Sequence, residues 1–393
     1  MSVPDMSPVA ATVTPPAGRA LAPDLARGGM LLFIAFAHAP LFVSAIDRGP
    51  AVVNEVTKVI HLLFVHNHAR PLFAFLFGYA LVQMMNRRQS RGSSWTDVRK
   101  LVRRRSWWLL VIGFVHVLLF TPLDILAPYG IAGLLLVGLL RAKGTTLLWV
   151  TGLTLIPATA AGAVGMWLPL SQGISSYTVG RMAIGDRDWA QALGDRMAGW
   201  PYGLVIGVLL VIPGVVFGMW VARRRVLDEP ENHRTLLWRF SVIATIVSVL
   251  GALPAALVEL GGWSNGSAGT VLAASVAQPL TGYAGGIALA GFIALAALGV
   301  ADRPGRMTTA VQALGQRSMT MYLFQTVVWV AVFTPFGLGL EDRTGLAGAT
   351  AVAIATWVVS AIMADLMRRA GYRGPAEILL RRLSYPRARS TTS

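Results

Sequence analysis

Cysteine is absent from the 393-residue chain. Disulfide bonds, thiolate metal sites and cysteine nucleophiles are therefore excluded. Charge is also scarce, since 13% of the residues are charged against about 25% in a typical soluble domain. Acidic residues are fewer than basic ones, with 18 Asp and Glu against 34 Lys and Arg, so the net charge is +16. Such a composition argues against an ordinary soluble domain.

Apolar residues make up 55% of the chain. A soluble fold of this length has no core large enough to hide so much apolar surface, so most of it must face lipid. The net charge would suit nucleic acid, but the basic residues lie between long apolar segments rather than on one soluble module. We therefore expect the lipid bilayer and a small-molecule or cell-envelope substrate as partners, and no nucleic acid.

The apolar segments predict an all-α, polytopic membrane protein with about ten transmembrane helices, because about 20 apolar residues cross ~30 Å of hydrocarbon. The predicted spans cover residues 25–46, 68–86, 104–120, 123–140, 146–168, 201–222, 236–258, 270–300, 318–338 and 346–367. They form one membrane domain over 23–368. It follows a disordered cytoplasmic tail at 1–22 and precedes a cytoplasmic amphipathic helix and tail at 369–393.

Lysine and arginine alternate in density from one predicted loop to the next. In the ten-span arrangement, 27 of the 34 fall on one side of the membrane and seven on the other. Cytoplasmic loops are enriched in Lys and Arg, so this alternation predicts that both termini are cytoplasmic. The protein is expected to be a multi-pass protein of the cell membrane.

The eighth predicted span combines Pro279 with Gly282, Gly285 and Gly286. Proline removes a backbone donor, and freed carbonyls persist in a membrane only where they are buried in protein or face water. We therefore expect the helix to break near 279–286 and to line a cavity.

His38 lies in the first predicted span, eleven residues after Arg27. This spacing is three helical turns, or ~16 Å, and puts both side chains on one face. A histidine inside the membrane should face the bundle. It is then either a proton-exchanging group beside a cavity or a structural histidine bonded to a neighbouring carbonyl. Arg27, near the inner boundary, suits phosphate groups.

A second group of histidines precedes the second span, in HLLFVHNHARP. The H-x-H pair is compatible with a metal, but no acid lies close by in sequence. We therefore expect no metal and assign His66 and His68 to the lining of an outer cavity. Arg70 follows at the same outer face, where it either binds an anionic group bidentately or anchors at the lipid headgroups.

His116, near the end of the third span, and Asp124, at the start of the fourth, are separated by a short turn. They could therefore approach, and an Asp that orients a His is the general device for making an imidazole base. The alternative is a helix-capping Asp beside a structural His.

Three consecutive arginines, Arg103, Arg104 and Arg105, precede the third span. They suit a phosphate-bearing substrate such as an acyl coenzyme. The enrichment of basic residues in cytoplasmic loops explains them equally well.

Five parts of the chain read PDLARGGMLLFIAFAH, RPLFAFLFGYAL, RRRSWWLLVIGFVHVLL with DILAPYGIAGLLL, LGQRSMTMYLFQT and GPAEILLRRLSY. Together and in this order they resemble the YeiB-like family, a domain-of-unknown-function group of bacterial membrane proteins. The last block is the most diagnostic, with Gly374, Pro375, Glu377, Leu380, Arg382 and Tyr385 at its characteristic positions. The resemblance covers nearly the whole chain and implies no assigned chemistry.

Residues 24–110 are also similar, more distantly, to membrane acyltransferases of the acyltransferase-three type. These enzymes have an Arg followed after ten residues by a His in their first span, as Arg27 and His38 are spaced here. Their second span usually has Ser where Phe77 stands, and basic residues precede their third span. The resemblance implies a catalytic role for His38 and a cytoplasmic coenzyme A thioester as acyl donor.

The leading hypothesis is a transmembrane acyltransferase that moves an acyl group from cytoplasmic acyl-coenzyme A to a cell-envelope or secreted acceptor. The expected catalytic group is His38, His116 and Asp124, and the expected substrate-binding group is Arg27, Arg70, His66, His68, Arg103, Arg104 and Arg105. One alternative is a transporter of a small anionic solute, although the acids lie near span ends rather than deep in the membrane. Another is a non-catalytic membrane scaffold.

Overall fold

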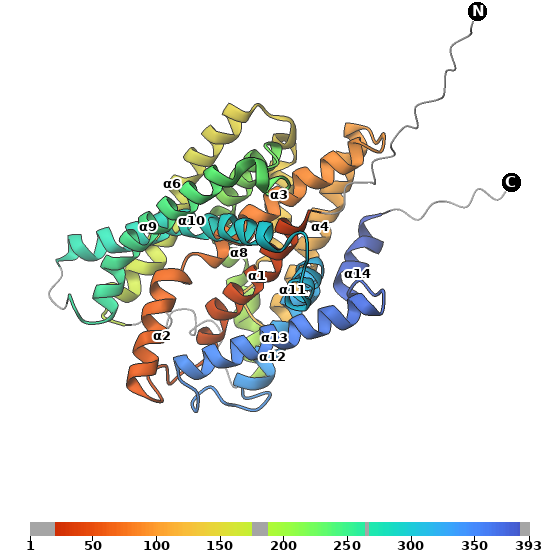
Figure 1. The fold of residues 1–393 in the computed structure, drawn as a ribbon. Helices are drawn as coiled ribbons and strands as arrows, with labels where there is room; N and C mark the ends of the chain where they lie inside the picture. Colours follow the sequence, from red (N-terminus) through yellow and green to blue (C-terminus); the bar gives the residue numbers. More distant parts are fainter. Residues whose placement is uncertain (1–19, 175–187, 264–266, 386–393) are drawn as a thin grey trace, which may run out of the picture.

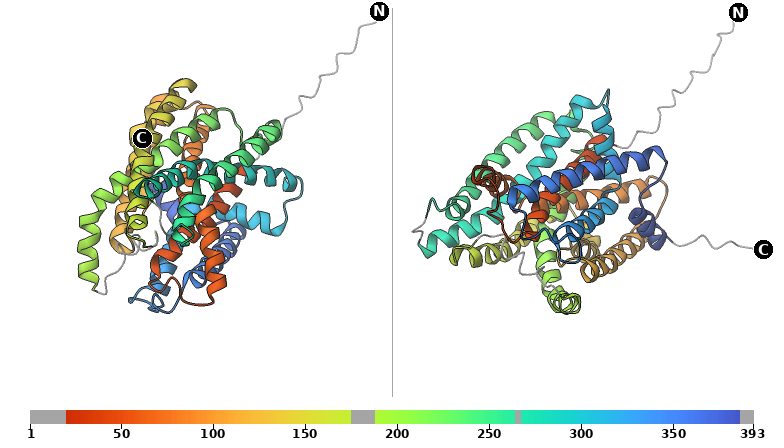
Figure 2. Two further views of the ribbon diagram at one scale, coloured as in Figure 1. Left: turned by 90° about the vertical axis from the view of Figure 1, so that its left-hand side faces the viewer. Right: turned by 90° about the horizontal axis from the view of Figure 1, so that it is seen from below.

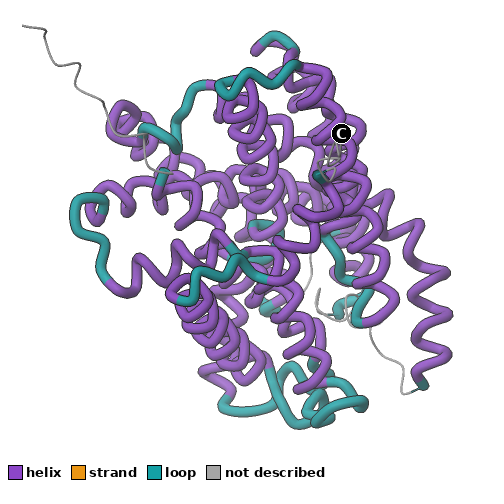
Figure 3. The backbone as a smooth tube through the Cα atoms, turned by 90° about the vertical axis from the view of Figure 1, so that its right-hand side faces the viewer, coloured by secondary structure: helices purple, strands orange, loops and turns teal. Residues whose placement is uncertain are grey.

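The computed structural model describes residues 20–174, 188–263 and 267–385 (Figure 1). The predicted tail at 1–22 lies almost entirely outside these residues. Within them every regular element is a helix, and the helices are joined by short loops (Figure 3). The predicted all-α class is therefore confirmed for this part of the chain.

The helices are α1 (Leu21–His38), α2 (Ala51–Phe64), α3 (Ala69–Gln89), α4 (Trp95–Leu119), α5 (Leu126–Leu136), α6 (Gly144–Ser171), α8 (Trp189–Arg223), α9 (Arg234–Glu259), α10 (Ala268–Val300), α11 (Arg306–Gln316), α12 (Ser318–Phe333), α13 (Leu346–Arg369) and α14 (Pro375–Ser384). Short 3₁₀ segments are η1 (Ala39–Phe42), η2 (Val137–Arg141) and η3 (Pro230–His233). Helices α4 and α10 have side-chain N-caps. Ser94 accepts a hydrogen bond from the Asp97 amide at the start of α4, and Ser267 accepts one from the Thr270 amide at the start of α10.

Six helices in the described residues are long and apolar enough to cross a membrane. They are Leu21–Phe42, Gly144–Ser171, Trp189–Arg223, Pro230–Glu259, Ala268–Val300 and Leu346–Arg369. Shorter apolar helices at Leu126–Arg141 and Ser318–Phe333 overlap the fourth and ninth predicted spans. Helices α3 and α4 overlap the second and third but carry arginines near their ends. The count of ten and the orientation of the termini remain predictions.

Several long helices turn apolar side chains outward. Trp149 on α6, Ile243 on α9 and Ile362 on α13 are all more exposed than buried. Apolar surface of this extent on three separate helices fits contact with lipid tails rather than water.

Helix α3 packs against α8, α10 and α1. Helices α6, α8, α9 and α10 form one group of neighbours, and α1 packs with α10, α11, α12 and α13 (Figures 1 and 2). The crossing of α3 and α8 is close enough to require glycine. A Cβ added to Gly78 would lie 1.9 Å from the Val215 carbonyl oxygen, and one on Gly218 would lie 2.0 Å from that of Phe75. Helix α3 is thereby held backbone to backbone against α8.

The predicted break in the eighth span is wrong, because α10 runs as one α-helix from Ala268 to Val300 with Pro279 inside it. The neighbouring glycines serve close packing instead. A Cβ on Gly285 would lie 2.4 Å from the His68 ring, and one on Gly286 would lie 2.5 Å from the His68 carbonyl oxygen. Gly285 and Gly286 therefore allow the turn before α3 to pack closely against α10, as small residues commonly do where membrane helices meet.

Candidate functional site

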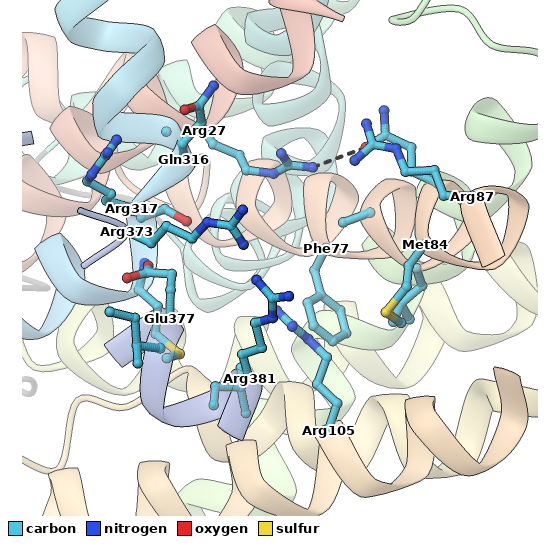
Figure 4. Close-up of a pocket in the computed structure, with 18 of the residues that line it drawn as sticks. Arg27, Phe77, Met84, Arg87, Arg105, Gln316, Arg317, Arg373, Glu377 and Arg381 are labelled. Carbon is cyan, nitrogen blue, oxygen red and sulfur yellow. Dashed lines mark hydrogen bonds between the residues drawn. The ribbon is translucent and has the colours of Figure 1, made fainter. Parts of the chain in front are cut away.

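A large pocket of about 1080 Å³ opens where the start of α1, the end of α3 and helix α14 meet (Figure 4). Its wall contains nine arginines: Arg27, Arg87, Arg88, Arg91, Arg105, Arg317, Arg373, Arg381 and Arg382. Glu377 is the one carboxylate among the described residues that line it. This excess of guanidinium groups suits a ligand with several negative charges.

The arginines come from distant parts of the sequence and share one space. Figure 4 shows Arg105 from α4, Arg381 from α14 and Arg373 from the preceding loop extending toward one another. Phe77 and Met84 of α3 add an apolar wall on the same side. A cationic centre beside an apolar wall fits an anionic ligand that also has an apolar part.

Arg27 lines this pocket and is held by hydrogen bonds. Its Nη1 donates to Asp24 Oδ1 at 2.9 Å, and its Nη2 donates to Gln83 Oε1 at 3.4 Å. Gln83 also donates to Asp228, which accepts a second bond from the Tyr79 hydroxyl. Asp24 balances part of the Arg27 charge, so the other arginines carry more of the pocket's positive potential.

Helix α14 forms one wall of the pocket and is fastened to α12 by Glu377. The carboxylate accepts hydrogen bonds from the backbone amides of Met319 at 2.9 Å and Thr320 at 3.1 Å, and another from the Thr320 hydroxyl. Gly374 precedes α14 with a φ of 73°, a conformation that favours glycine. An acidic side chain thus caps the amino-terminal end of a neighbouring helix, where four amides lack intrahelical partners.

A second set of hydrogen bonds joins the start of α12 to the loop before α14. Arg317, at the start of α12, donates from Nε at 3.0 Å and from Nη2 at 2.6 Å to the carbonyl oxygen of Tyr372. At the far end of α14, the Arg88 guanidinium lies 4.8 Å from the centre of the Tyr385 ring. The segments LGQRSMTMYLFQT and GPAEILLRRLSY are therefore structural partners.

The three consecutive arginines separate in the structure. Arg105 is half-buried and lines the pocket, whereas Arg103 and Arg104 are exposed and are not among the lining residues. Residues one and two positions earlier on a helix point away from the face that carries Arg105.

His38 ends α1, at the other end of the helix from the pocket. Its half-buried ring lies 6.4 Å from the ring of Tyr322 on α12, centre to centre. Arg70, His116 and Asp124 lie within electrostatic range of it. Three of the predicted site residues are thus brought to the neighbourhood of His38.

His116 and Asp124 make direct contact, as the short turn between their helices predicts. His116 Nδ1 lies 3.1 Å from Asp124 Oδ1, and both side chains are buried. A Cβ on Gly113 would lie 2.4 Å from Asp124 Oδ2, so glycine makes room for the carboxylate. The other His116 nitrogen lies 3.1 Å from Thr326 Oγ1. Both ring nitrogens of His116 therefore have partners.

A column of aromatic rings lies between the pocket and His38. Tyr129 stacks on Phe77 with 4.6 Å between ring centres and on Phe73 with 5.0 Å. Phe73 in turn lies 6.5 Å from Tyr322, which contacts His38. Phe77, which stands where the acyltransferase-three pattern has Ser, is therefore both a wall of the pocket and the first ring of this column.

The predicted outer histidines occupy different surroundings. His68 is buried, with Nε2 at 2.7 Å from Ser248 Oγ and Nδ1 at 2.7 Å from the His66 carbonyl oxygen, so it joins α3 to α9. His66 is half-buried, and burial together with the nearby Arg70 lowers its pKa to about 4. It is therefore neutral at pH 7. Within the described residues no three metal-ligating side chains come together.

Sequence reasoning missed Asp24, Gln83, Asp228 and Glu377, and it placed Arg373, Arg381 and Arg382 in a cytoplasmic segment without a binding role. The positions of Glu377, Arg381 and Arg382 depend on how α14 folds back against α4 and α12. The one signal in the sequence was the density of arginine in the last block.

Comparison with known proteins shows what the chain is similar to. Residues 221–387 match the family described as "Protein of unknown function (DUF418)". The chain is 25% identical to the uncharacterized protein YxaH of Bacillus subtilis, over 92% of this chain and 93% of that protein. It is 26% identical to the uncharacterized protein YeiB of Escherichia coli, over 80% of each chain.

The family match covers α9 to α14 and so includes the pocket wall formed by Arg317, Glu377 and Arg381. His38 lies outside the matched range. None of these matches bears on the acyltransferase similarity of residues 24–110, which stays a prediction. The chain is thus similar to YxaH and YeiB over most of its length, and residues 221–387 match the DUF418 family model.

Proposed function

We propose that the protein is a transmembrane acyltransferase whose arginine pocket binds a coenzyme A thioester from the cytoplasm. The observation that carries the proposal is the pocket itself, where nine arginines and one carboxylate surround about 1080 Å³. A coenzyme A thioester has three phosphate groups, which need several guanidinium partners. All nine arginines belong to the side that the loop charges predict to be cytoplasmic.

Helix α1 supports the next step, because it connects the pocket to the proposed reaction centre. Arg27 lines the pocket, and His38 stands eleven residues further along the same helix, ~16 Å away. His38 would take the proton from the hydroxyl or amine of the acceptor. The acyl carbon then bonds to that oxygen or nitrogen, the carbon–sulfur bond breaks, and the coenzyme leaves as a thiol after gaining a proton.

The aromatic column would control access of the donor's thioester from the arginine pocket to His38. Phe77 separates the pocket from Tyr129, Phe73 and the surroundings of His38. The thioester arm of the donor would have to displace Phe77 to reach His38. A closed column in the absence of donor would keep water and small solutes from crossing.

Binding of acetyl-coenzyme A to the purified protein tests the pocket. Calorimetry should give a complex that the double substitution of Arg105→Gln and Arg381→Gln weakens by at least about a hundredfold, because two charge-assisted contacts at about 1.5–3 kcal/mol each are removed. Arg103→Gln is the matched control, since Arg103 is exposed and does not line the pocket. Equal affinities for the double variant and the control would contradict the proposed donor site.

A further inference from the structure

Arg70 is the second residue of α3 and lies at the opposite end of that helix from the arginine pocket. Its side chain is exposed. The buried Tyr129 and Tyr283 lie within electrostatic range of it. An exposed guanidinium beside two buried tyrosines is accessible to a ligand at this end of the bundle.

Among the described residues no acidic side chain is paired with Arg70. In the described part of the chain its guanidinium has neither a hydrogen bond nor an ion pair, and the titratable groups within electrostatic range are Tyr129, Tyr283, His38 and His66. The nearby carboxylate of Asp124 is bonded to His116 and to the Ala127 amide. A guanidinium without an anionic partner, beside two buried tyrosines, favours an anionic ligand.

Tyr129 provides a second, independent sign of a ligand. It is 1% exposed, and its hydroxyl has no hydrogen-bond partner. The ring is fixed because Phe73 and Phe77 stack on its two faces. The hydroxyl lies within electrostatic range of Arg70. A buried hydroxyl without a partner costs free energy, which a ligand oxygen near Arg70 would recover.

The backbone that carries Arg70 is held rigidly. His68 is bonded to Ser248, and Asn67 donates to Gln278 at 3.0 Å. Gly285 of α10 lets this turn approach closely. The point from which the Arg70 side chain extends is therefore fixed.

We propose that Arg70 and the Tyr129 hydroxyl form an oxyanion-binding site for the acyl acceptor. Naming this ligand as the acceptor rests on the proposed function. Arg70 is also within electrostatic range of His38, so the acceptor's anionic group and its reacting hydroxyl or amine would be held together. The acceptor class is therefore a small hydroxy or amino compound with a carboxylate, phosphate or sulfate group.

Succinate and inorganic sulfate are suitable probes, with neutral succinamide as the uncharged comparison. Titration calorimetry on the protein in lipid nanodiscs should detect binding of an oxyanion but not of succinamide. Arg70→Gln should weaken that binding by about tenfold or more, and Arg70→Lys by less. Tyr129→Phe, which removes one hydroxyl only, should weaken it by about three- to tenfold. Preference for succinate or sulfate would separate a carboxylate ligand from a sulfate- or phosphate-like one.

Arg105→Gln controls for anions that bind in the arginine pocket instead. Oxyanion binding that persists in Arg70→Gln but disappears in Arg105→Gln would overturn the proposal, as would equal binding to wild type, Arg70→Gln and Tyr129→Phe. The unliganded Arg70→Gln protein should melt at the same temperature or higher, because an unbalanced charge is removed. A lower melting temperature would indicate a structural arginine and would also contradict the proposal.

Acetyl-coenzyme A binding separates this site from the proposed donor site. It should be the same in wild type and Arg70→Gln. If the wild type bound oxyanions through Arg70 but did not bind acetyl-coenzyme A, the acyltransferase proposal would fail and the anion site would stand. If acetyl-coenzyme A bound but oxyanions did not, the reverse would hold.

Discussion

Replacing Glu377 with Ala should release α14 from the bundle. The carboxylate accepts hydrogen bonds from the amides of Met319 and Thr320 and from the Thr320 hydroxyl. Loss of a helix cap costs about 0.5–2 kcal/mol, and hydrogen bonds to a charged group contribute about 1.5–3 kcal/mol each. These contributions overlap, so we expect α14 docking to weaken by about 2–3 kcal/mol. The population with α14 detached should then rise about 30- to 150-fold.

Hydrogen exchange measures this opening directly. The peptide that contains Met319 and Thr320 should exchange faster in Glu377→Ala by about the same factor, with little change in helices such as α9. Glu377→Gln keeps an acceptor oxygen and should show a smaller effect. Glu231→Ala, at an exposed glutamate outside the pocket, is the matched control. Exchange at wild-type rates in Glu377→Ala would refute the assignment of Glu377 as the fastening of α14.

Three further changes test other parts of the structure. Gly78→Ala should lower the melting temperature strongly, because the added Cβ would lie 1.9 Å from a backbone oxygen, whereas Gly152→Ala, with open space around it, should be neutral or stabilising. Burial lowers the pKa of His61 to about 4 in the folded protein, so the unfolded chain binds more protons between the ordinary value of 6.5 and pH 4. Melting temperature should therefore fall as pH falls through that range, and less steeply in His61→Gln; parallel curves would exclude a contribution from His61. Reporter fusions in the α8–α9 loop should report cytoplasm and those in the α12–α13 loop the outside, and the reverse result would contradict the predicted orientation.

The all-α fold and the positions of the long helices could be predicted because they depend on local composition. Apolar segments of sufficient length are readable in a single sequence, and all six long apolar helices of the described residues coincide with predicted spans. The contact between His116 and Asp124 could also be predicted, since a short turn leaves two helix ends close together.

The arginine pocket could not be assembled from the sequence. Its wall joins Arg27, Arg105 and Arg381, whose association depends on α14 folding back against α4 and α12. The basic residues of the final block read equally well as a membrane-surface helix, because the sequence pattern does not specify a partner.

The glycines near Pro279 illustrate a second limit. Proline and glycine in a span are compatible with a broken helix and with a close helix contact. The outcome was decided by the turn at His68, which packs against Gly285 and Gly286 from a segment more than two hundred residues earlier. A single sequence contains no record of such a contact.

Turnover of acetyl-coenzyme A tests the central claim most directly. Purified protein in proteoliposomes is supplied with acetyl-coenzyme A, and release of the free thiol is followed with water as the acceptor. We expect the wild type to release thiol, and His38→Ala to be slower by about 10²–10⁴ while it still melts normally and binds acetyl-coenzyme A. Equal release by wild type and a folded His38→Ala variant, or no release by either, would contradict acyl transfer through His38.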